Sequence, residues 1–335
     1  MRAPYRVRAD MARLDDERAV PSSVDPGPAT VFRGDRTWPG LLAERLDALE
    51  AAPSGVRAVD AQAADDTLRI AGACVARHAA AELPSRVSVE RGAVVLHGLG
   101  LRVTKAGAVE HVSAGEAGPT DALPDASLRV RAQALLRDRP PQLRTLEALA
   151  LALQEDLVLI GPAGPSDEGC DEHGTGRVSW LHVAFPSGWD PGSMAGASFE
   201  RLHAPVPEAD ALRRAATALV QAMLRKGPFV RYVWGLSPDG ARARHPRHAQ
   251  PMPPDHPLDA AWLRVERQTT LALPEAGAAM FAIGVHVTPL SEALAAPDRR
   301  AAFADAVASL TPAMRRYKGV PWDEVTVRAW CRSLP

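Results

Sequence analysis

The chain has 335 residues, with 39 Lys and Arg against 40 Asp and Glu, so its formal charge is −1. A charge this close to zero provides no overall field that would attract nucleic acid or an anionic membrane, which excludes nucleic-acid binding as a leading function. The length is typical of about two domains, or of one domain with an extension. No secretory signal opens the sequence and no run of 18 apolar residues occurs in it, so we expect a cytoplasmic protein without membrane contact.

The cysteines have no CxxC spacing, which argues against a disulfide framework or a structural zinc site. They are Cys74, Cys170 and Cys331. Cys74 precedes His78 by one helical turn, and a Gly-rich loop brings Asp171 and His173 next to Cys170. Neither group supplies a full tetrahedral ligand set, so we favour core packing for the first and keep a metal site as a minor alternative for the second.

The first 142 residues are expected to form an N-terminal extension. Residues 1–40 are rich in Pro, Asp and Arg and show little periodicity. Helical spacing of apolar residues then predicts helices over 38–51 and about 61–82. Short alternating bursts separated by glycines predict a small β-meander over 87–112, and residues 119–141 are expected to form a linker around a short helix.

A second group of elements runs from residue 143 to residue 291. In chain order we predict a helix over 143–154, strands over 157–160 and 177–185, a helical segment over 198–227, and strands over 229–235, 262–273 and 279–287. A Pro- and His-rich insert covers 237–257, and helices over 298–333 are expected to cap the C-terminus. The predicted domains are therefore 1–142, 143–291 and 292–335.

Two strands, a helical segment and three further strands are the element order of a PAS-like domain. We therefore predict an α+β fold in which a five-stranded antiparallel sheet carries helices on one face, with the N-terminal extension and the helical cap added. A ligand is expected between the sheet and the helices that follow the second strand. The fold alone does not determine the function.

The strand predicted over 262–273 places Arg267 on an apolar face, between Val265 and Thr269. A buried guanidinium must be paired, hydrogen-bonded or directed at a polar ligand, because an unpaired buried charge costs about 3–5 kcal/mol. Glu266 points to the opposite face, so a regular strand lets only one of the two enter a pocket, and the alternation favours Arg267. The alternative is an arginine whose stem packs while its head reaches water.

Two further groups are expected at the same pocket. His203 opens the segment HAPVP, whose prolines stiffen the backbone, and a rigidly held imidazole suits an axial iron ligand. Arg231, with Tyr232 and Trp234, lies on the third predicted strand and is a second arginine on an apolar face. The alternatives are a helix-capping or core role for His203 and a structural salt bridge for Arg231.

Several segments resemble, in order, the haem-dependent oxidative N-demethylase α-subunit family, whose members have a PAS fold. They are QEDLVLI (154–160), FPSGWDPGSMAG (185–196), HAPVP (203–207), RVERQTTLALP (264–274) and FAIGVHVTPL (281–290), with a weaker likeness in RRYKG (315–319). The pair HAPVP and ERQT, at this separation, is the most specific of these signals.

The resemblance implies a b-type haem held between helix and sheet, and oxidative removal of a methyl group from a small secondary amine such as dimethylamine with O2. It makes His203 the proximal iron ligand, with Tyr232 and Trp234 as further cofactor contacts. Arg267, Glu266 and Arg231 would bind the amine and polarise the oxygen ligand. Electrons are expected from NADPH through partner subunits that carry FMN and a 2Fe–2S cluster, since three scattered cysteines cannot ligate a cluster in this chain.

The main alternative is a non-catalytic haem or small-molecule sensor with the same fold, and a third possibility is a relic that binds no haem. Haem binding that survives loss of His203 would move the ligand to His182, to His286 or to a histidine of the insert. No GxGxxG, Walker loop, GxSxG or HExxH motif occurs, so nucleotide-binding, serine-hydrolase and zincin functions have no motif support.

Overall fold

The computed structural model describes residues 11–14, 29–34, 36–112, 124–162 and 176–334. The α-helices in these residues are α1 (Trp38–Ala51), α2 (Pro53–Val56), α3 (Asp65–Glu82), α4 (Ala126–Arg137), α5 (Arg144–Ala152), α6 (Phe199–His203), α7 (Asp210–Arg214), α8 (Ala216–Arg225), α9 (Leu290–Ala293), α10 (Pro297–Ala308), α11 (Pro312–Tyr317) and α12 (Glu324–Ser333). Short 3-10 turns are η2 (His97–Leu99), η3 (Pro191–Met194), η4 (Leu258–Ala260) and η5 (Pro274–Ala276).

The strands form two antiparallel sheets. They are β1 (Ala12–Arg13), β2 (Arg57–Val59), β3 (Val87–Glu90), β4 (Ala93–Leu96), β5 (Leu101–Val103), β6 (Val109–His111), β7 (Asp156–Gly161), β8 (Arg177–His182), β9 (Phe229–Ser237), β10 (Trp262–Leu273) and β11 (Ala278–Pro289). In the described part of the chain the main sheet has seven strands, in the order β1-β9-β10-β11-β7-β8-β2. The five strands predicted for the core are its middle, and β1 and β2 extend it at the two edges.

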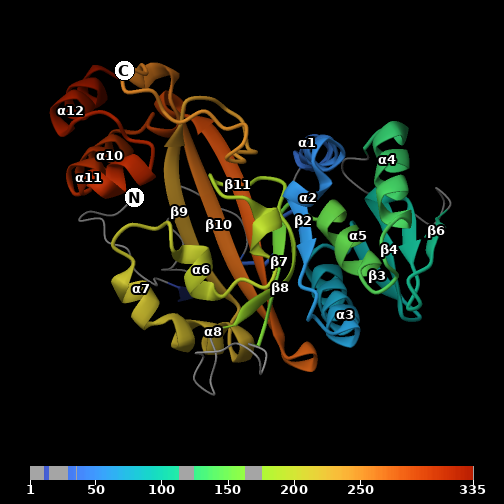
Figure 1. The fold of residues 1–335 in the computed structure, drawn as a ribbon. Coiled ribbons are helices and arrows are strands. Elements are labelled where there is room, and N and C mark those ends of the chain that lie inside the picture. The colour runs from blue at the N-terminus through green and yellow to red at the C-terminus, as the bar shows by residue number, and fades with distance from the viewer. Residues whose placement is uncertain (1–10, 15–28, 35, 113–123, 163–175, 335) are drawn as a thin grey trace.

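Helices cover both faces of the main sheet, so the prediction of helices on one face was wrong. Figure 1 shows α6, α7 and α8 on one side of β9, β10 and β11, and α3 with α5 on the other side. The inner strand β7 is buried along its whole length, as expected for a strand covered from both sides. The apolar stripe of α3 packs against the main sheet. The N-terminal elements and the sheet therefore share one apolar core, whose members include residues from Leu14 to Val285.

The other predicted elements are largely present. Strands β3 to β6 form the expected meander, which packs on α3 and α5. The helical segment predicted over 198–227 is divided into α6, α7 and α8. Pro205 and Pro207 separate α6 from α7, since they provide no amide hydrogen for a continuous helix. The C-terminal helices α10 to α12 surround a second apolar cluster that includes Leu236 of β9 and Trp322. None of the described helices has the length and apolar character needed to cross a membrane.

Candidate functional site

A cavity of about 1210 Å³ lies between the main sheet and helices α6 to α8. The sheet contributes apolar side chains from Val158, Ile160, Leu181, Phe281 and Ile283, and the helices contribute Leu202, Leu212, Leu219 and Met223. Most small-molecule sites measure roughly 300–1,000 Å³. The cavity is therefore large enough for a bulky cofactor together with a small substrate.

A line of polar residues crosses the cavity side of β9 and β10. Arg231 and Gln268 are paired in the strand register, and Arg231 Nε donates to Gln268 Oε1 at 2.5 Å. Gln268 Nε2 in turn donates to Glu266 Oε2 at 2.7 Å. The second carboxylate oxygen, Glu266 Oε1, accepts a hydrogen bond from Ser187 Oγ. Hydrogen bonds from the side chains of Gln268 and Ser187 therefore hold both carboxylate oxygens of Glu266 in place.

Arg264 lies behind this carboxylate, two residues before it on the same face of β10. Its side chain is 6 % exposed, and Nη2 lies 3.8 Å from Glu266 Oε1. Nε donates to Ser187 Oγ at 2.7 Å, and Nη2 donates to the carbonyl of Phe185 at 2.6 Å. A buried guanidinium with these acceptors partly neutralises Glu266 and fixes the hydroxyl that binds it.

Positive charge predominates around the cavity. The cationic residues that line it are Arg231, Arg244, Arg264, Arg316 and Lys318. Among the described residues that line the cavity, Glu266 is the carboxylate. The site can therefore accept anionic groups at several points and a cationic group at one.

Arg267 lies on the opposite face of β10 and does not line the cavity, so the preference for Arg267 over Glu266 was wrong. The guanidinium donates to the main-chain carbonyls of Val31, at 3.0 Å, and Thr30. Arg267 is 2 % exposed. Glu266 and Arg267 point to opposite faces of β10, as predicted. The apolar face that carries Arg267 packs on the N-terminal elements, and the sequence pattern does not reveal this packing.

His203 ends α6 and lines the cavity from the helical side. Its Nδ1 lies 2.8 Å from the carbonyl oxygen of Phe199, one helical turn earlier, and the two rings stack at a centroid distance of 4.2 Å. A carbonyl can only accept, so Nδ1 carries the proton and Nε2 keeps its lone pair. Burial, together with the positive charge of Arg231, lowers the pKa of His203 to about 4. The imidazole is therefore neutral at pH 7 and has the tautomer of a metal ligand that binds through Nε2.

Tyr232 and Trp234 border the cavity from β9, but they alternate with Arg231 and so face the other side of the strand. Tyr232 is paired in the register with Arg267, and Trp234 with Val265. The Trp234 indole packs near Phe303 of α10, with ring centroids 6.2 Å apart. These two residues therefore sit at the sheet edge, apart from the group formed by Arg231, Glu266 and His203.

The C-terminal cap supplies a wall of the cavity that was not expected from the sequence. Residues 316–321 line it, and the main chain of Lys318 runs along the edge of β9, with its carbonyl accepting from Leu236 N at 2.7 Å. Tyr317 also lines the cavity and is 47 % exposed. Partial burial of its ring, and next the charge of Glu266, raises the pKa of the phenol. Tyr317 and Lys318 belong to RRYKG, and Ser187 and Arg264 to FPSGWD and RVERQ, so motif membership was the available signal for them.

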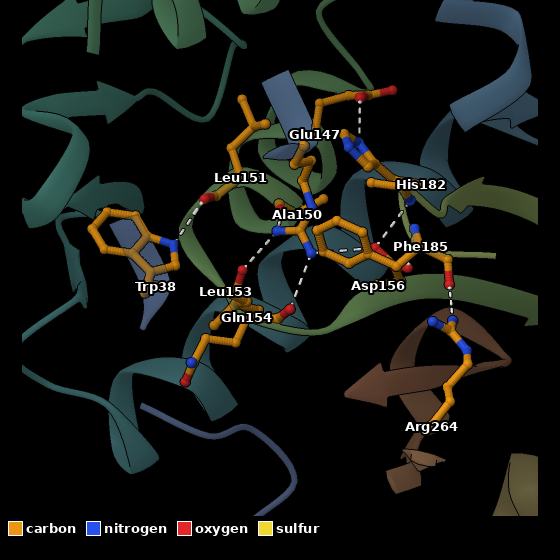
Figure 2. A network of polar contacts seen from close by, with 12 residues as sticks. Trp38, Glu147, Ala150, Leu151, Leu153, Gln154, Asp156, His182, Phe185 and Arg264 are labelled. Atoms are coloured by element: carbon orange, nitrogen blue, oxygen red, sulfur yellow. Dashed lines mark hydrogen bonds and ion pairs between the residues drawn. The ribbon is translucent and has the colours of Figure 1, made fainter. Parts of the chain in front are cut away.

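A buried polar network connects α1 to this site. The guanidinium of Arg45 is fully buried and donates to carbonyls in the last turn of α5 and just after it, those of Ala150 (2.5 Å), Leu153 (2.8 Å) and Gln154 (3.0 Å). It also forms an ion pair with Asp156 at 3.2 Å. Asp156 accepts from the amides of Ala184 and Phe185, and the Phe185 carbonyl accepts from Arg264, as Figure 2 shows. The turn that presents Ser187 to Glu266 is thus tied to the protein core.

The other metal-ligand candidates do not assemble. Cys74 accepts a hydrogen bond from Arg77, while His78 Nε2 lies 3.1 Å from Glu82. In the described ranges no group of three or more His, Cys, Asp or Glu side chains could hold a metal ion. Cys170, Asp171 and His173 fall outside the described residues.

The two alternative iron ligands named from the sequence lie away from the cavity. His182 is buried, with Nδ1 3.0 Å from Glu147, and His286 lies on the exposed part of β11. Of the histidines that the structure describes, His203 is the one that lines the cavity.

Comparison with protein families gives one match that covers most of the chain. A family model described as "Haem-dependent oxidative N-demethylase, alpha subunit-like" matches residues 111–327. No curated protein matches significantly. The matched range includes His203, Arg231, Arg264, Glu266 and Gln268 of the cavity, whereas Arg45 lies outside it.

Proposed function

This chain belongs to the haem-dependent oxidative N-demethylase, alpha subunit-like family, and we propose that it is a haem-dependent monooxygenase subunit. The proposed reaction removes a methyl group from a small secondary amine such as dimethylamine, with O2 as oxidant and electrons from a partner reductase. The observation that carries the proposal is the hydrogen bond from His203 Nδ1 to the Phe199 carbonyl, because it leaves Nε2 able to bind iron inside the cavity.

The cavity also suits the rest of a b-type haem. A porphyrin is a large apolar plate with two carboxylates, and here apolar walls from the sheet and from α6 to α8 are combined with several cations. Arg231, Arg244 and Arg316 are the proposed partners of the two carboxylates, since arginine binds carboxylates through paired N–H donors. Tyr232 and Trp234 would contact the cofactor only at the border of the cavity. When bound, the haem would supply the activation of O2 that oxidises the methyl group.

The protein side chains then have distinct roles. Glu266 would bind the amine, which is cationic at neutral pH, and Ser187 and Gln268 would keep its two oxygens aimed at the substrate. Arg231 would donate hydrogen bonds to O2 or to a haem carboxylate. The apolar side chains of α8 and β11 would exclude water. Arg267 has no part in this mechanism, because it lies behind the sheet.

We also propose that the middle five strands, β9-β10-β11-β7-β8, are a PAS-like core. Its proposed limits are residues 143–291, with 1–142 as an N-terminal extension and 292–335 as a cap. The family match begins before this core and ends after it, at 111–327, and the cavity takes part of its wall from residues 316–321. The extension and the cap would therefore complete the site.

The proposed partners follow from the chemistry that the chain lacks. Oxidative demethylation with O2 consumes two electrons, and the three cysteines of the sequence cannot provide the four ligands of an iron–sulfur cluster. We propose that NADPH, FMN and a 2Fe–2S centre belong to partner subunits that deliver these electrons.

The decisive test is the absorption spectrum of the protein produced with adequate haem. We expect a Soret band at roughly 400 nm that shifts on reduction and carbon monoxide binding, as for a haem with an open position. His203→Ala should lose this band while its circular dichroism is unchanged, and His111→Ala, an exposed residue of β6, should keep it. A wild-type protein that binds no added haemin would overturn the proposal. Bound haem without amine-dependent O2 consumption, in the presence of a competent reductase, would instead identify a non-catalytic haem protein.

A further inference from the structure

Lysine is rare in this chain, and one of the few lysines is buried. The 39 basic residues include only Lys105, Lys226 and Lys318 as lysines. Lys105 and Lys226 are exposed, whereas Lys318 is 3 % exposed and lines the cavity. Arginine fills nearly every other cationic position, although it is the side chain better suited to a permanent buried charge. Lys318 thus places at the cavity an amine that, unlike an arginine guanidinium, can lose its proton and become a nucleophile.

The surroundings of Lys318 are fixed by the fold. Its amide donates to Met314 O at 2.9 Å and its carbonyl accepts from Leu236 N at 2.7 Å, so the residue is clamped between α11 and β9. The side-chain nitrogen Nζ donates to the carbonyl of Trp234 at 2.6 Å and lies 4.5 Å from the centroid of the Trp234 ring. Both of these partners are uncharged, and each of them favours the ammonium form, so the lowering of the pKa comes from burial. Burial in this setting lowers the pKa of Lys318 to about 7, against the opposing charge of Glu266.

This environment makes the amine reactive at neutral pH. A lysine with a pKa of about 7 is roughly half neutral at pH 7, whereas an ordinary lysine is neutral in about one molecule in 2,500. Desolvated lysines of this kind react with carbonyl compounds to form Schiff bases. The neutral amine keeps a lone pair for this reaction while one of its N–H groups donates to Trp234 O.

We propose that Lys318 is a carbonyl-capture site that binds small, uncharged aldehydes as an imine. The amine nitrogen adds to the aldehyde carbon and the aldehyde oxygen leaves as water, so that the lysine amine and formaldehyde give an N-methylene imine and one water molecule without any change in redox state. The near-complete burial of Lys318 restricts the ligand to small carbonyls, and an uncharged one is favoured because a charged group would have to lose its water beside the buried amine. The identity of the aldehyde rests on the proposed function, since oxidative removal of an N-methyl group releases formaldehyde in this cavity.

The three lysines provide an internal comparison in a single experiment. The full-length protein is treated briefly with limiting formaldehyde and cyanoborohydride at pH 7, which reduces each imine to an N-methyl group, and the methylated peptides are quantified by mass spectrometry. We expect Lys318 to be methylated at least about tenfold faster than Lys105 and Lys226, because a much larger fraction of its amine is neutral. The preference should shrink as the pH is raised toward 10, where ordinary lysines also become neutral.

Two controls separate reactivity from accessibility. Urea-unfolded protein should methylate all three lysines at similar rates, and Lys318→Arg should leave the methylation of Lys105 and Lys226 unchanged. Protection of Lys318 relative to the exposed lysines at every pH in the folded protein would overturn the proposal. The reaction needs neither reductase nor amine substrate. Preferential labelling of Lys318 in a protein without demethylase activity would therefore support the capture site while the proposed function fails.

Discussion

At the scale of single residues, the negative charge of Glu266 is the feature that would bind a small cationic amine. Glu266→Gln removes the negative charge and keeps one acceptor oxygen, while its NH2 group replaces the second oxygen that accepts a hydrogen bond from Ser187 or Gln268. We expect the amine to bind roughly 10- to 100-fold more weakly, in line with the 1.5–3 kcal/mol that hydrogen bonds to charged groups contribute. Titration of the haem absorption spectrum with dimethylamine measures this affinity. Glu275→Gln, which removes an exposed carboxylate 2.7 Å from Arg77, should have no effect on it.

Arg267 offers the matched comparison, because it is adjacent in sequence and lies on the opposite face. Arg267→Met removes the donors to the carbonyls of Thr30 and Val31, and should lower the free energy of unfolding by about 2–4 kcal/mol. Amine affinity in the folded variant should be unchanged. An affinity loss as large as that of Glu266→Gln would contradict the assignment of the two faces. The sequence predicted that these neighbours diverge, but not which face the cavity occupies, since that depends on where distant N-terminal segments pack.

At the scale of elements, charged side chains bind the main chain of the segment 30–33 on the back of the sheet, while Val31 and Phe32 pack into the apolar core. Glu82 accepts from the amides of Val31 and Phe32, and Glu155 accepts from the amide of Arg33. Arg267 binds the carbonyls of the same segment from β10. Glu155 is 1 % exposed, and this burial raises its pKa to about 7. The segment is therefore bound by a carboxyl group whose ionised form is unfavourable in the folded protein.

This leads to a prediction about pH. The pKa of Glu155 is raised from 4.5 to about 7 in the folded state, so its stabilising contribution is complete below pH 4.5 and is lost as the pH rises through 7. Glu155→Gln cannot ionise and should be more stable than the wild type at pH 8, by up to about 3 kcal/mol, and nearly equal to it at pH 4.5. Urea unfolding of both proteins across this range provides the measurement. His203 has the opposite dependence, since its pKa is lowered to about 4, but it is common to both proteins and cancels in the difference. An equal stability difference at both pH values would refute the prediction.

The elements themselves were largely predictable, whereas their partners were not. Long periodic segments such as α1 and β10 were predicted with nearly their observed limits because their apolar spacing is regular. The edge strands β1 and β2 have only two and three residues and carry no pattern that a sequence reading could detect. Likewise, the amphipathic pattern of α3 predicts a buried stripe but cannot say that the back of the main sheet buries it.

At the scale of the whole molecule, the site depends on contacts between segments that are far apart in sequence. The helix α1, the turn after β8, the strand β10 and the cap segment 316–321 all contribute. His203 and Glu266 could be proposed from motifs, and Arg231 from its position on an apolar face of a predicted strand. Asp156 lies in the QEDLVLI segment, but the connection of Arg45 and Asp156 to Glu266 could not be predicted, since it passes through main-chain atoms of the turn at 184–187.

That connection can be measured as a coupling energy. The path runs from the Arg45–Asp156 ion pair to the Phe185 amide, from the Phe185 carbonyl to Arg264, and from Arg264 through Ser187 to Glu266. Asp156→Asn should destabilise the protein by about 3–5 kcal/mol, because Arg45 is left without its buried counter-ion. If the turn then releases Ser187, the variant should also bind the amine more weakly, with haem content unchanged.

A double-mutant cycle separates this effect from a general loss of stability. Amine affinity is measured for Asp156→Asn, Glu266→Gln and the double variant. We expect a coupling of about 0.5–3 kcal/mol, because Asp156→Asn should weaken amine binding only while the Glu266 carboxylate is present. Ser187→Ala replaces Asp156→Asn if the latter does not fold, because it breaks the same path next to Glu266. Asp60→Asn, which breaks a 2.9 Å ion pair with Arg177 outside the path, should combine additively with Glu266→Gln. Additivity of Asp156→Asn or Ser187→Ala with Glu266→Gln would show that the core network supports the fold without orienting the carboxylate.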